Sequence, residues 1–172
     1  MQLGNILKSI DKKYKKVNIK GISFDSRKVK NKDIFFAIDG KKKSGVKFID
    51  KAILKGASVA IVNKKNKIKN KKILLIKVNN VRKSLSEAST KFYKKKPKSI
   101  LAVTGTNGKS SVSDFFYQIL SSNKIPVASI GTLGIISKKF KKKTNLTSLD
   151  SLSLNKYLEV LARKKINTVI LE

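Results

Sequence analysis

The 172-residue sequence contains no cysteine and no histidine. Without cysteine there is no disulfide framework and no thiolate metal site. Without histidine, imidazole metal ligands and a histidine general base are also excluded. No segment approaches the roughly 20 consecutive apolar residues of a membrane-spanning helix, and the N-terminus lacks the pattern of a signal peptide. We therefore expect a soluble, cytoplasmic protein that has no membrane partner.

Arginine is scarce although the formal net charge is +31. Arg27, Arg82 and Arg163 are the only arginines among 41 basic residues, and the lysines are spread over loops and polar helix faces. Base recognition and forked contacts to phosphate favour arginine over lysine. We therefore expect no specific nucleic-acid partner, and a lysine-rich nucleic-acid-binding protein is kept as an alternative. The charge still attracts anionic ligands in general.

A short apolar run at residues 99–103 predicts a buried strand, and glycine-rich sequence follows it directly. Beyond the glycines, apolar residues recur at the spacing i, i+3, i+4, i+7 and i+8, which predicts the apolar face of a helix. These residues are Val112, Phe115, Phe116, Ile119 and Leu120. A strand thus enters a glycine loop that opens a helix, which is the order of elements in a phosphate-binding cradle.

The loop carries the residue types that phosphate binding requires. Gly105 and Gly108 let backbone N–H groups turn towards an anion, and the start of the helix adds partial positive charge. Lys109 can reach a β- or γ-phosphate, and the Ser110 hydroxyl can ligate Mg²⁺. The spacing differs from the standard Walker pattern, which has a glycine where this sequence has Val103. The alternative interpretation is a glycine turn that binds nothing.

Strand and helix patterns alternate along both halves of the chain, which indicates an α/β fold with mostly parallel sheets. A hairpin with its turn near Lys138 is expected at 135–143. Pro97 follows a run of three lysines, which is typical of a linker. We expect a small N-terminal α/β domain at 1–96, followed at 97–172 by the start of a P-loop-type parallel-sheet domain. Further strands are predicted at 17–24, 33–38, 58–62, 73–78, 126–130 and 167–171.

Four stretches of the chain resemble the Mur ligases, and within that family the UDP-N-acetylmuramoyl-tripeptide synthetases. They are residues 24–27 with the strand at 33–37, the loop at 40–49, the glycine loop at 104–110, and residues 147–154. The last stretch resembles the family's Thr-Thr-Pro-Asp-x-Leu-Thr-Leu, with Leu149 in place of the proline. In the loop at 40–49, the family's Asp-Gly-His is replaced by Ser44, Gly45 and Val46.

The resemblance implies a role for each domain and for several residues. The N-terminal domain would hold the UDP end of the substrate through Phe24 and Ser26. The central domain would hold ATP, while Thr147 and Ser148 would contact the muramoyl-peptide. Glu172 matches the family's Mg²⁺-binding glutamate and would ligate the metal together with Ser110. The implied ATP-binding residues are Gly105, Thr106, Asn107, Gly108, Lys109, Ser110 and Ser111, with Lys109 as the catalytic residue.

The implied reaction is the ATP-dependent ligation of an amino acid to UDP-MurNAc-L-Ala-D-Glu in peptidoglycan synthesis, through an acyl phosphate. Its cofactors are ATP and Mg²⁺, and its partners are the UDP-MurNAc-dipeptide and an amino acid; the identity of the amino acid and the oligomeric state stay open. The family continues beyond the segment that ends at Glu172, so we expect an incomplete fragment that is inactive alone and exposes apolar sheet edges. A folylpolyglutamate-synthetase-like ligase is the other alternative, although that class would not need residues 24–27 or 147–154.

Overall fold

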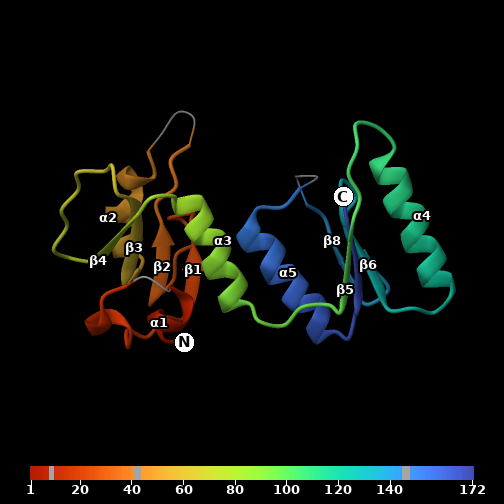
Figure 1. The fold of residues 1–172 in the computed structure, drawn as a ribbon, viewed down its shortest axis with the longest axis horizontal. Coiled ribbons are helices and arrows are strands. Elements are labelled where there is room, and N and C mark those ends of the chain that lie inside the picture. Colours follow the sequence, from red (N-terminus) through yellow and green to blue (C-terminus); the bar gives the residue numbers. More distant parts are fainter. Residues whose placement is uncertain (8–9, 41–43, 145–147) are drawn as a thin grey trace. The chain divides into compact units, whose positions relative to one another are not determined.

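The computed structural model describes residues 1–7, 10–40, 44–144 and 148–172. The chain divides into two compact units, Met1–Phe92 and Tyr93–Glu172, and each unit has a sheet and helices of its own (Figure 1). The α/β fold predicted from the sequence is confirmed. The division between the units lies at the end of a helix, four residues before the expected boundary at 96/97.

The first unit is built on a fully parallel four-stranded sheet. Its strands are β1 (Gly21–Ser23), β2 (Asp33–Phe36), β3 (Val59–Asn63) and β4 (Leu74–Val78), in the order β1-β2-β3-β4. All four residues of β2 and the first four residues of β3 are buried. Parallel strands are covered on both faces, so they carry continuous apolar runs rather than an alternating pattern.

Helices cover both faces of this sheet. Phe35, Ala60 and Val62 point to one face and form a core cluster with Ile49 and Ala52 of α2 (Ile49–Leu54). The alternate strand residues point to the other face, where α3 (Val81–Phe92) contacts β2 and β3 and also packs against α1 (Leu3–Ile6). Short 3-10 turns at Lys12–Tyr14 and Gly45–Phe48 complete the unit.

Strand β1 is shorter than the strand predicted at 17–24. The backbone of its expected first half pairs with the N-terminus instead: Leu3 N donates to Val17 O and Ile19 N donates to Met1 O, both at 2.8 Å. An antiparallel bridge between Gln2 and Asn18 lies between these bonds. A pattern of side chains reveals that a segment is extended, but it does not reveal the partner of its backbone.

The second unit has a mixed five-stranded sheet in the order β5-β9-β6-β7-β8. The strands are β5 (Ser99–Ala102), β6 (Val127–Gly131), β7 (Gly134–Ser137), β8 (Phe140–Lys142) and β9 (Thr168–Leu171). Strands β5, β9 and β6 are parallel, while β7 and β8 are antiparallel to their neighbours, so the predicted hairpin at 135–143 is confirmed. Helix α5 (Ser151–Arg163) packs Leu158 and Leu161 against β6 and β9, and α4 (Lys109–Ser122) also contacts these two strands.

The expected burial of the strand at 99–103 is wrong, and the apolar face predicted for the helix after it is exposed. All residues of β5 are exposed. Among the described residues of α4, Ser113 alone is buried. The reason is that β5 is the end strand, paired with β9 alone, and the apolar stripe of α4 does not face the sheet. No helix within the described ranges is long and apolar enough to span a membrane.

Candidate functional site

The glycine loop between β5 and α4 has a backbone conformation that requires its glycines. Gly105 has φ 153° and Gly108 has φ 75°, values that residues with a side chain rarely adopt. Gly108 is the N-cap of α4, and its carbonyl accepts the first helical hydrogen bond from Val112 N at 2.9 Å. The loop therefore ends where the free N–H groups of the helix begin, which is where an anion binds.

The expected ATP-binding side chains lie on this loop and on the first turn of α4. The Lys109 Nζ donates to the carbonyl oxygen of Thr106 at 3.2 Å, so the ammonium group folds back over the loop. Thr106, Asn107 and Ser111 are exposed. A compact cation above free backbone N–H groups makes the loop suitable for the phosphates of a nucleotide.

The two expected metal ligands, Ser110 and Glu172, are in direct contact. The Ser110 Oγ donates to Glu172 Oε1 at 2.5 Å. Thr132, which the sequence analysis did not select, donates its backbone N–H to Oε2 at 2.9 Å and its hydroxyl to Oε1 at 3.0 Å. Three parallel strands supply this arrangement, because Ser110 follows β5, Thr132 follows β6 and Glu172 follows β9. Carboxyl ends of parallel strands are where such sheets bind ligands.

The surroundings of Glu172 favour its ionised form. The hydrogen bond from Ser110 is the largest cause that holds the pKa of Glu172 below its usual range, and the bond from the Thr132 backbone follows. The charge of Lys109 acts in the same direction. Glu172 is therefore a carboxylate at neutral pH, as a metal ligand must be.

Gly131 provides the space in which this carboxylate lies. A Cβ atom at position 131 would be 2.3 Å from Glu172 Oε2 and 2.7 Å from Glu172 Cβ, which is closer than any real contact. The sequence contained a signal for this role, because Gly131 directly follows an apolar strand segment. That signal indicates a turn equally well, so only the structure identifies the glycine as part of the site.

The donor set fits Mg²⁺ bound together with phosphates. Ser110 and Glu172 offer one hydroxyl and one carboxylate, both of which are hard oxygen ligands. No group of three or more acidic, cysteine or histidine side chains occurs among the described residues that could hold a metal alone. Mg²⁺ commonly takes one or two protein oxygens and completes its coordination with phosphate and water.

The first unit contains a separate pocket of about 420 Å³ around Phe24 and Ser26. Phe24 and Phe48 are each 37% exposed on its walls. The Arg27 side chain donates to both oxygens of Asp25, at 3.0 and 2.9 Å, and this contact holds the pKa of Asp25 below its usual range. Aromatic faces and nearby cations can hold a planar base and a phosphate. The pocket is lined by Phe24, Asp25, Ser26, Arg27, Phe48 and Lys51.

Phe48 and Lys51 were not selected from the sequence. Phe48 lies in the 3-10 turn before α2 and Lys51 lies in α2, more than twenty residues from Phe24. The apolar spacing of this helix identifies the residues that pack inwards, such as Ile49 and Ala52, and gives no information on the opposite side. Only the packing of α2 beside the turn at 24–27 brings them together.

The fourth stretch that carried the resemblance is described in part. Thr147 lies outside the described residues, and Ser148 is exposed shortly before α5. Asp150 caps α5, because its Oδ1 accepts from Ser153 N at 2.9 Å and its Oδ2 accepts from Ser153 Oγ at 2.7 Å. Asp150 therefore caps the N-terminus of α5.

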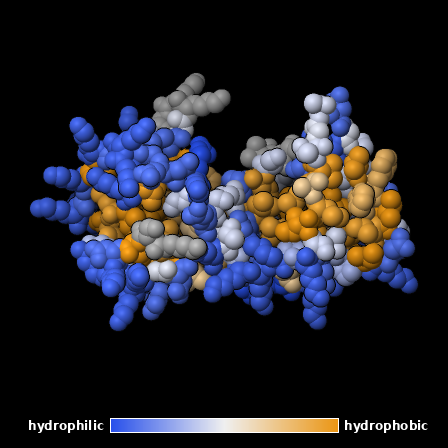
Figure 2. Space-filling view, in the orientation of Figure 1, coloured by the Kyte–Doolittle hydropathy of each residue, from blue (hydrophilic) through white to orange (hydrophobic). Residues whose placement is uncertain are grey.

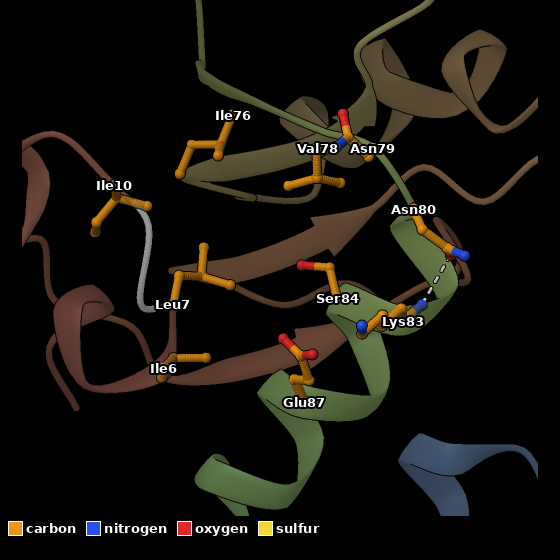
Figure 3. A pocket seen from close by; sticks show the side chains of 10 residues that line it. All are labelled: Ile6, Leu7, Ile10, Ile76, Val78, Asn79, Asn80, Lys83, Ser84 and Glu87. Carbon is orange, nitrogen blue, oxygen red and sulfur yellow. Dashed lines mark hydrogen bonds between the residues drawn. The ribbon is translucent and has the colours of Figure 1, made fainter.

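A second cavity of the first unit, of about 400 Å³, contains none of the predicted site residues. It lies between the N-terminal segment, β4 and α3 (Figure 3). Its polar rim comes from α3 and from Asn79 and Asn80, which precede this helix; Lys83 N donates to Asn80 Oδ1 at 2.9 Å. Its other walls are apolar. The lining residues are Ile6, Leu7, Ile10, Ile76, Val78, Asn79, Asn80, Lys83, Ser84 and Glu87.

Two family models match this chain. The model described as Mur ligase family, catalytic domain, matches residues 18–93, and the Mur ligase middle domain matches residues 103–172. Similar curated proteins are UDP-N-acetylmuramoyl-L-alanyl-D-glutamate--2,6-diaminopimelate ligases. The one from Rickettsia rickettsii is 42% identical over 90% of this chain and 33% of its own length. The one from Bradyrhizobium diazoefficiens is 38% identical over 91% of this chain and 32% of its own length.

Solved structures give the same result. The match to a structure of a UDP-N-acetylmuramoyl-L-alanyl-D-glutamate--2,6-diaminopimelate ligase includes 100% of this chain and 36% of the ligase chain. Its TM-score is 0.80 and the sequence identity is 26%. The match to the MurF ligase from Thermotoga maritima in complex with ADP includes 89% of this chain and 31% of the MurF chain, with a TM-score of 0.58. The identity is 23%, so this match shows the fold alone. The chain spans about a third of the length of the proteins it matches.

Proposed function

Because this chain belongs to the Mur ligase family, we propose that it supplies the ATP-binding loop and the UDP-sugar pocket of an ATP-dependent ligase. The proposed reaction joins an amino acid to UDP-MurNAc-L-Ala-D-Glu in peptidoglycan synthesis. The curated relatives are named for 2,6-diaminopimelate, which is therefore the amino acid that we propose. The observation that carries the proposal is the contact between Ser110 and Glu172 beside the glycine loop.

The reaction would proceed in two steps through an acyl phosphate. The terminal carboxylate of the sugar peptide attacks the γ-phosphorus of ATP, and ADP leaves. The amine of the amino acid then attacks the acyl carbon, phosphate leaves, and the amide loses the proton that the amine carried. Charge develops on the transferred phosphoryl group, so its stabilisation is mainly electrostatic.

The chain's own residues would orient and stabilise the phosphates. The backbone N–H groups at the start of α4 bind phosphate oxygens, and Lys109 exchanges the carbonyl of Thr106 for a phosphate oxygen. Ser110 and Glu172 would hold Mg²⁺, which neutralises phosphate charge when bound. In this proposal the carboxylate of Glu172 is kept in place by Thr132 and by the space above Gly131.

The pocket at Phe24 is the proposed site for the uridine end of the substrate. An exposed ring beside the base contributes stacking, and Ser26 supplies a hydroxyl in a buried position. Phe48 and Lys51 add a second ring and a cation to the same pocket. Thr147 and Ser148 keep their proposed role towards the muramoyl-peptide. These 172 residues would bind both nucleotides, while complete ligation needs the other two thirds of the length of the relatives.

Calorimetric titration of a non-hydrolysable Mg-ATP analogue tests the nucleotide site. Lys109→Ala should weaken binding by about tenfold or more, because a charge-assisted hydrogen bond is lost. Lys139→Ala removes an equal charge from an exposed turn of the same unit and should bind like the parent chain. Equal affinities of the Lys109→Ala variant and the parent chain would contradict the proposal.

Titration of UDP tests the other pocket separately. Phe24→Ala should weaken UDP binding by about tenfold, because base–aromatic stacking contributes about 1–3 kcal/mol. Phe115→Ala also removes an exposed ring, from the other unit, and should leave UDP binding unchanged. Loss of UDP binding in both variants, or in neither, would count against the assignment.

A further inference from the structure

The cavity of about 400 Å³ in the first unit, which we call the β4 recess, lies where the helix layer ends before the sheet does. Helix α3 contacts β2 and β3, and β4 lies beyond them at the end of the sheet. Leu75 packs on the α2 side, so Ile76 and Val78 point to the opposite face, where they stay half-buried. Figure 2 shows apolar side chains at the surface of the first unit in the region of β4. One wall of the recess is therefore an uncovered apolar strip of the sheet.

The N-terminal segment forms the second apolar wall, with Ile6, Leu7 and Ile10. Ile6 and Leu7 are buried, and the Lys91 Nζ donates to the carbonyl oxygen of Ile6 at 3.1 Å, which ties this wall to the last turn of α3. Small-molecule sites in proteins have this size and combine apolar walls with a few polar groups. The recess therefore offers an apolar group of a ligand two walls against which it can pack.

Glu87 is an unpaired carboxylate at the rim of the recess. The chain has 41 basic and 10 acidic residues, and each of the other acidic side chains has a hydrogen bond or an ion pair. Glu87 has neither within the described parts of the chain. Figure 3 shows its side chain directed from α3 towards the space that Leu7 and Ser84 also border. The carboxylate is therefore available to a cationic group of a ligand.

Lys83 places the opposite charge one helical turn before Glu87. Residues four apart lie on the same side of a helix, with about 5–6 Å between their Cβ atoms. The three ion pairs found among the described residues do not include these two side chains, and both are exposed. Ser84 adds a hydroxyl to the same rim. The rim thus presents a cation, an anion and a hydroxyl beside an apolar hollow.

We propose that the β4 recess binds an α-amino acid with an apolar side chain, as a zwitterion. Both charged groups of such a ligand are attached to one carbon, so its ammonium group can pair with Glu87 while its carboxylate pairs with Lys83. The Ser84 hydroxyl donates to the same carboxylate, and the apolar side chain enters the recess. A plain anion would leave Glu87 unpaired. 2,6-Diaminopimelate fits poorly, because its side chain ends in charged groups that the apolar walls would desolvate.

This site is separate from both proposed nucleotide sites. The β4 recess shares no lining residue with the pocket around Phe24, and it lies in a different unit from the glycine loop. The proposal does not rest on the proposed function. It is tested without ATP or UDP, so its failure would be distinct from failure of nucleotide binding.

Titration of the isotope-labelled chain, followed by the NMR shifts of its backbone amides, measures weak binding and locates it. The probes are L-leucine, isocaproate, which is leucine without its amine, and isoamylamine, which is leucine without its carboxyl group. We expect saturable shifts with leucine at residues 76–78 and 80–87. Each analogue should bind about fivefold more weakly, because one exposed ion pair is lost. The net charge of +31 favours isocaproate, so its weaker binding would isolate the contribution of Glu87.

Two variants assign the charged groups. Glu87→Gln should weaken leucine binding about fivefold and should not weaken isocaproate binding, while Lys83→Gln should weaken leucine and spare isoamylamine. Both side chains are exposed, so the fold should persist, and unchanged amide shifts in the second unit would confirm it. Glu159→Gln makes the same change on α5 of the second unit and should bind leucine like the parent chain.

Several results would overturn the proposal. Isocaproate that binds as tightly as leucine would mean that the recess, if occupied, selects anions alone. Leucine that gives no saturable shifts, or shifts confined to residues outside the recess, would remove the site. A Glu87→Gln chain that binds leucine as tightly as the parent chain would show that the carboxylate does not recognise the amine.

Discussion

Gly131 determines where the carboxylate of Glu172 can lie. The side chain of Glu172 occupies the position that a Cβ at residue 131 would take, and Thr132 and Ser110 then hold its two oxygens. A residue without a side chain thus positions a residue that carries charge. In the proposed metal site, Gly131 would act indirectly, in the manner of groups that orient a ligand without touching the metal.

Gly131→Ala should therefore weaken Mg-ATP binding by about 10–100-fold, the usual cost of disturbing a group that orients a metal ligand. Binding of ATP without Mg²⁺ should change much less, because the glycine loop and Lys109 are not displaced. Calorimetry with Mg²⁺ and with EDTA measures both quantities. Thr132→Ser keeps both donors to Glu172 and serves as the matched control. Equal losses with and without Mg²⁺ would show that Gly131 does not act through Glu172.

Asp33 is a buried carboxyl group at the start of β2 whose protonation changes stability. Burial is the largest cause that raises its pKa above the ordinary 3.8, and the backbone N–H of Lys30, at 2.8 Å from Oδ2, partly opposes this rise. Between pH 3.8 and the folded pKa, Asp33 therefore keeps its proton in the folded chain and loses it in the unfolded chain. The free energy of unfolding should fall as pH rises from 3.8 through the folded pKa, and it should then level off.

Urea denaturation at several pH values from about 3.5 to 7 measures this fall. Asp33→Asn should remove the contribution of Asp33 to the slope of the free energy of unfolding against pH. The amide does not titrate, and its oxygen can still accept the hydrogen bond from Lys30 N. An unchanged slope in the variant would mean that other groups cause the pH dependence.

At the scale of the element, the start of α5 depends on the Asp150 cap. The carboxylate satisfies the N–H of Ser153, one of the donors that a helix start leaves free. Asp150→Ala should lower the stability of α5 by about 1 kcal/mol, whereas Asp150→Asn should retain most of it. Hydrogen exchange of the α5 amides measures the change. If both variants lose stability equally, the charge of Asp150 contributes rather than its hydrogen bond.

Elements with a strong pattern could be predicted from the sequence. The continuous apolar run at 33–38 indicated a buried strand, and the structure confirms it as β2. The environment of β5 and α4 could not be predicted, because an apolar pattern shows that a face can be buried and does not show what covers it. The length of β1 was overestimated because a side-chain pattern also does not show the partner of a backbone. The backbone of 17–19 pairs with the N-terminus.

The candidate site shows the same limit. Ser110 and Glu172 could be selected because a loop pattern and a family resemblance marked them, and the structure brings them into contact. Thr132, Phe48 and Lys51 carry no such mark. Their relevance comes from strand order in one unit and from the packing of α2 in the other, which local spacing does not encode.

At the scale of the whole molecule, the charge of +31 predicts weak attraction to any polyanion. Binding to duplex DNA should be independent of sequence and should fall steeply, by about 10³-fold or more between about 50 and 200 mM salt. Lys109→Ala should not change it, since one charge among many is lost. Fluorescence anisotropy with two unrelated duplexes checks this expectation. Sequence preference that persists at high salt would instead favour the nucleic-acid-binding alternative.

The far edge of the second sheet limits how large an assembly can grow through it. This edge is β8, which has only three residues, and Lys141 and Lys142 are exposed on it. Short, lysine-bearing edges resist the addition of strands. Within the described residues, the sheet therefore has one edge that is open to a further strand and one edge that is protected against it. Copies of this chain cannot join edge to edge into a filament, because such growth needs pairing at both edges.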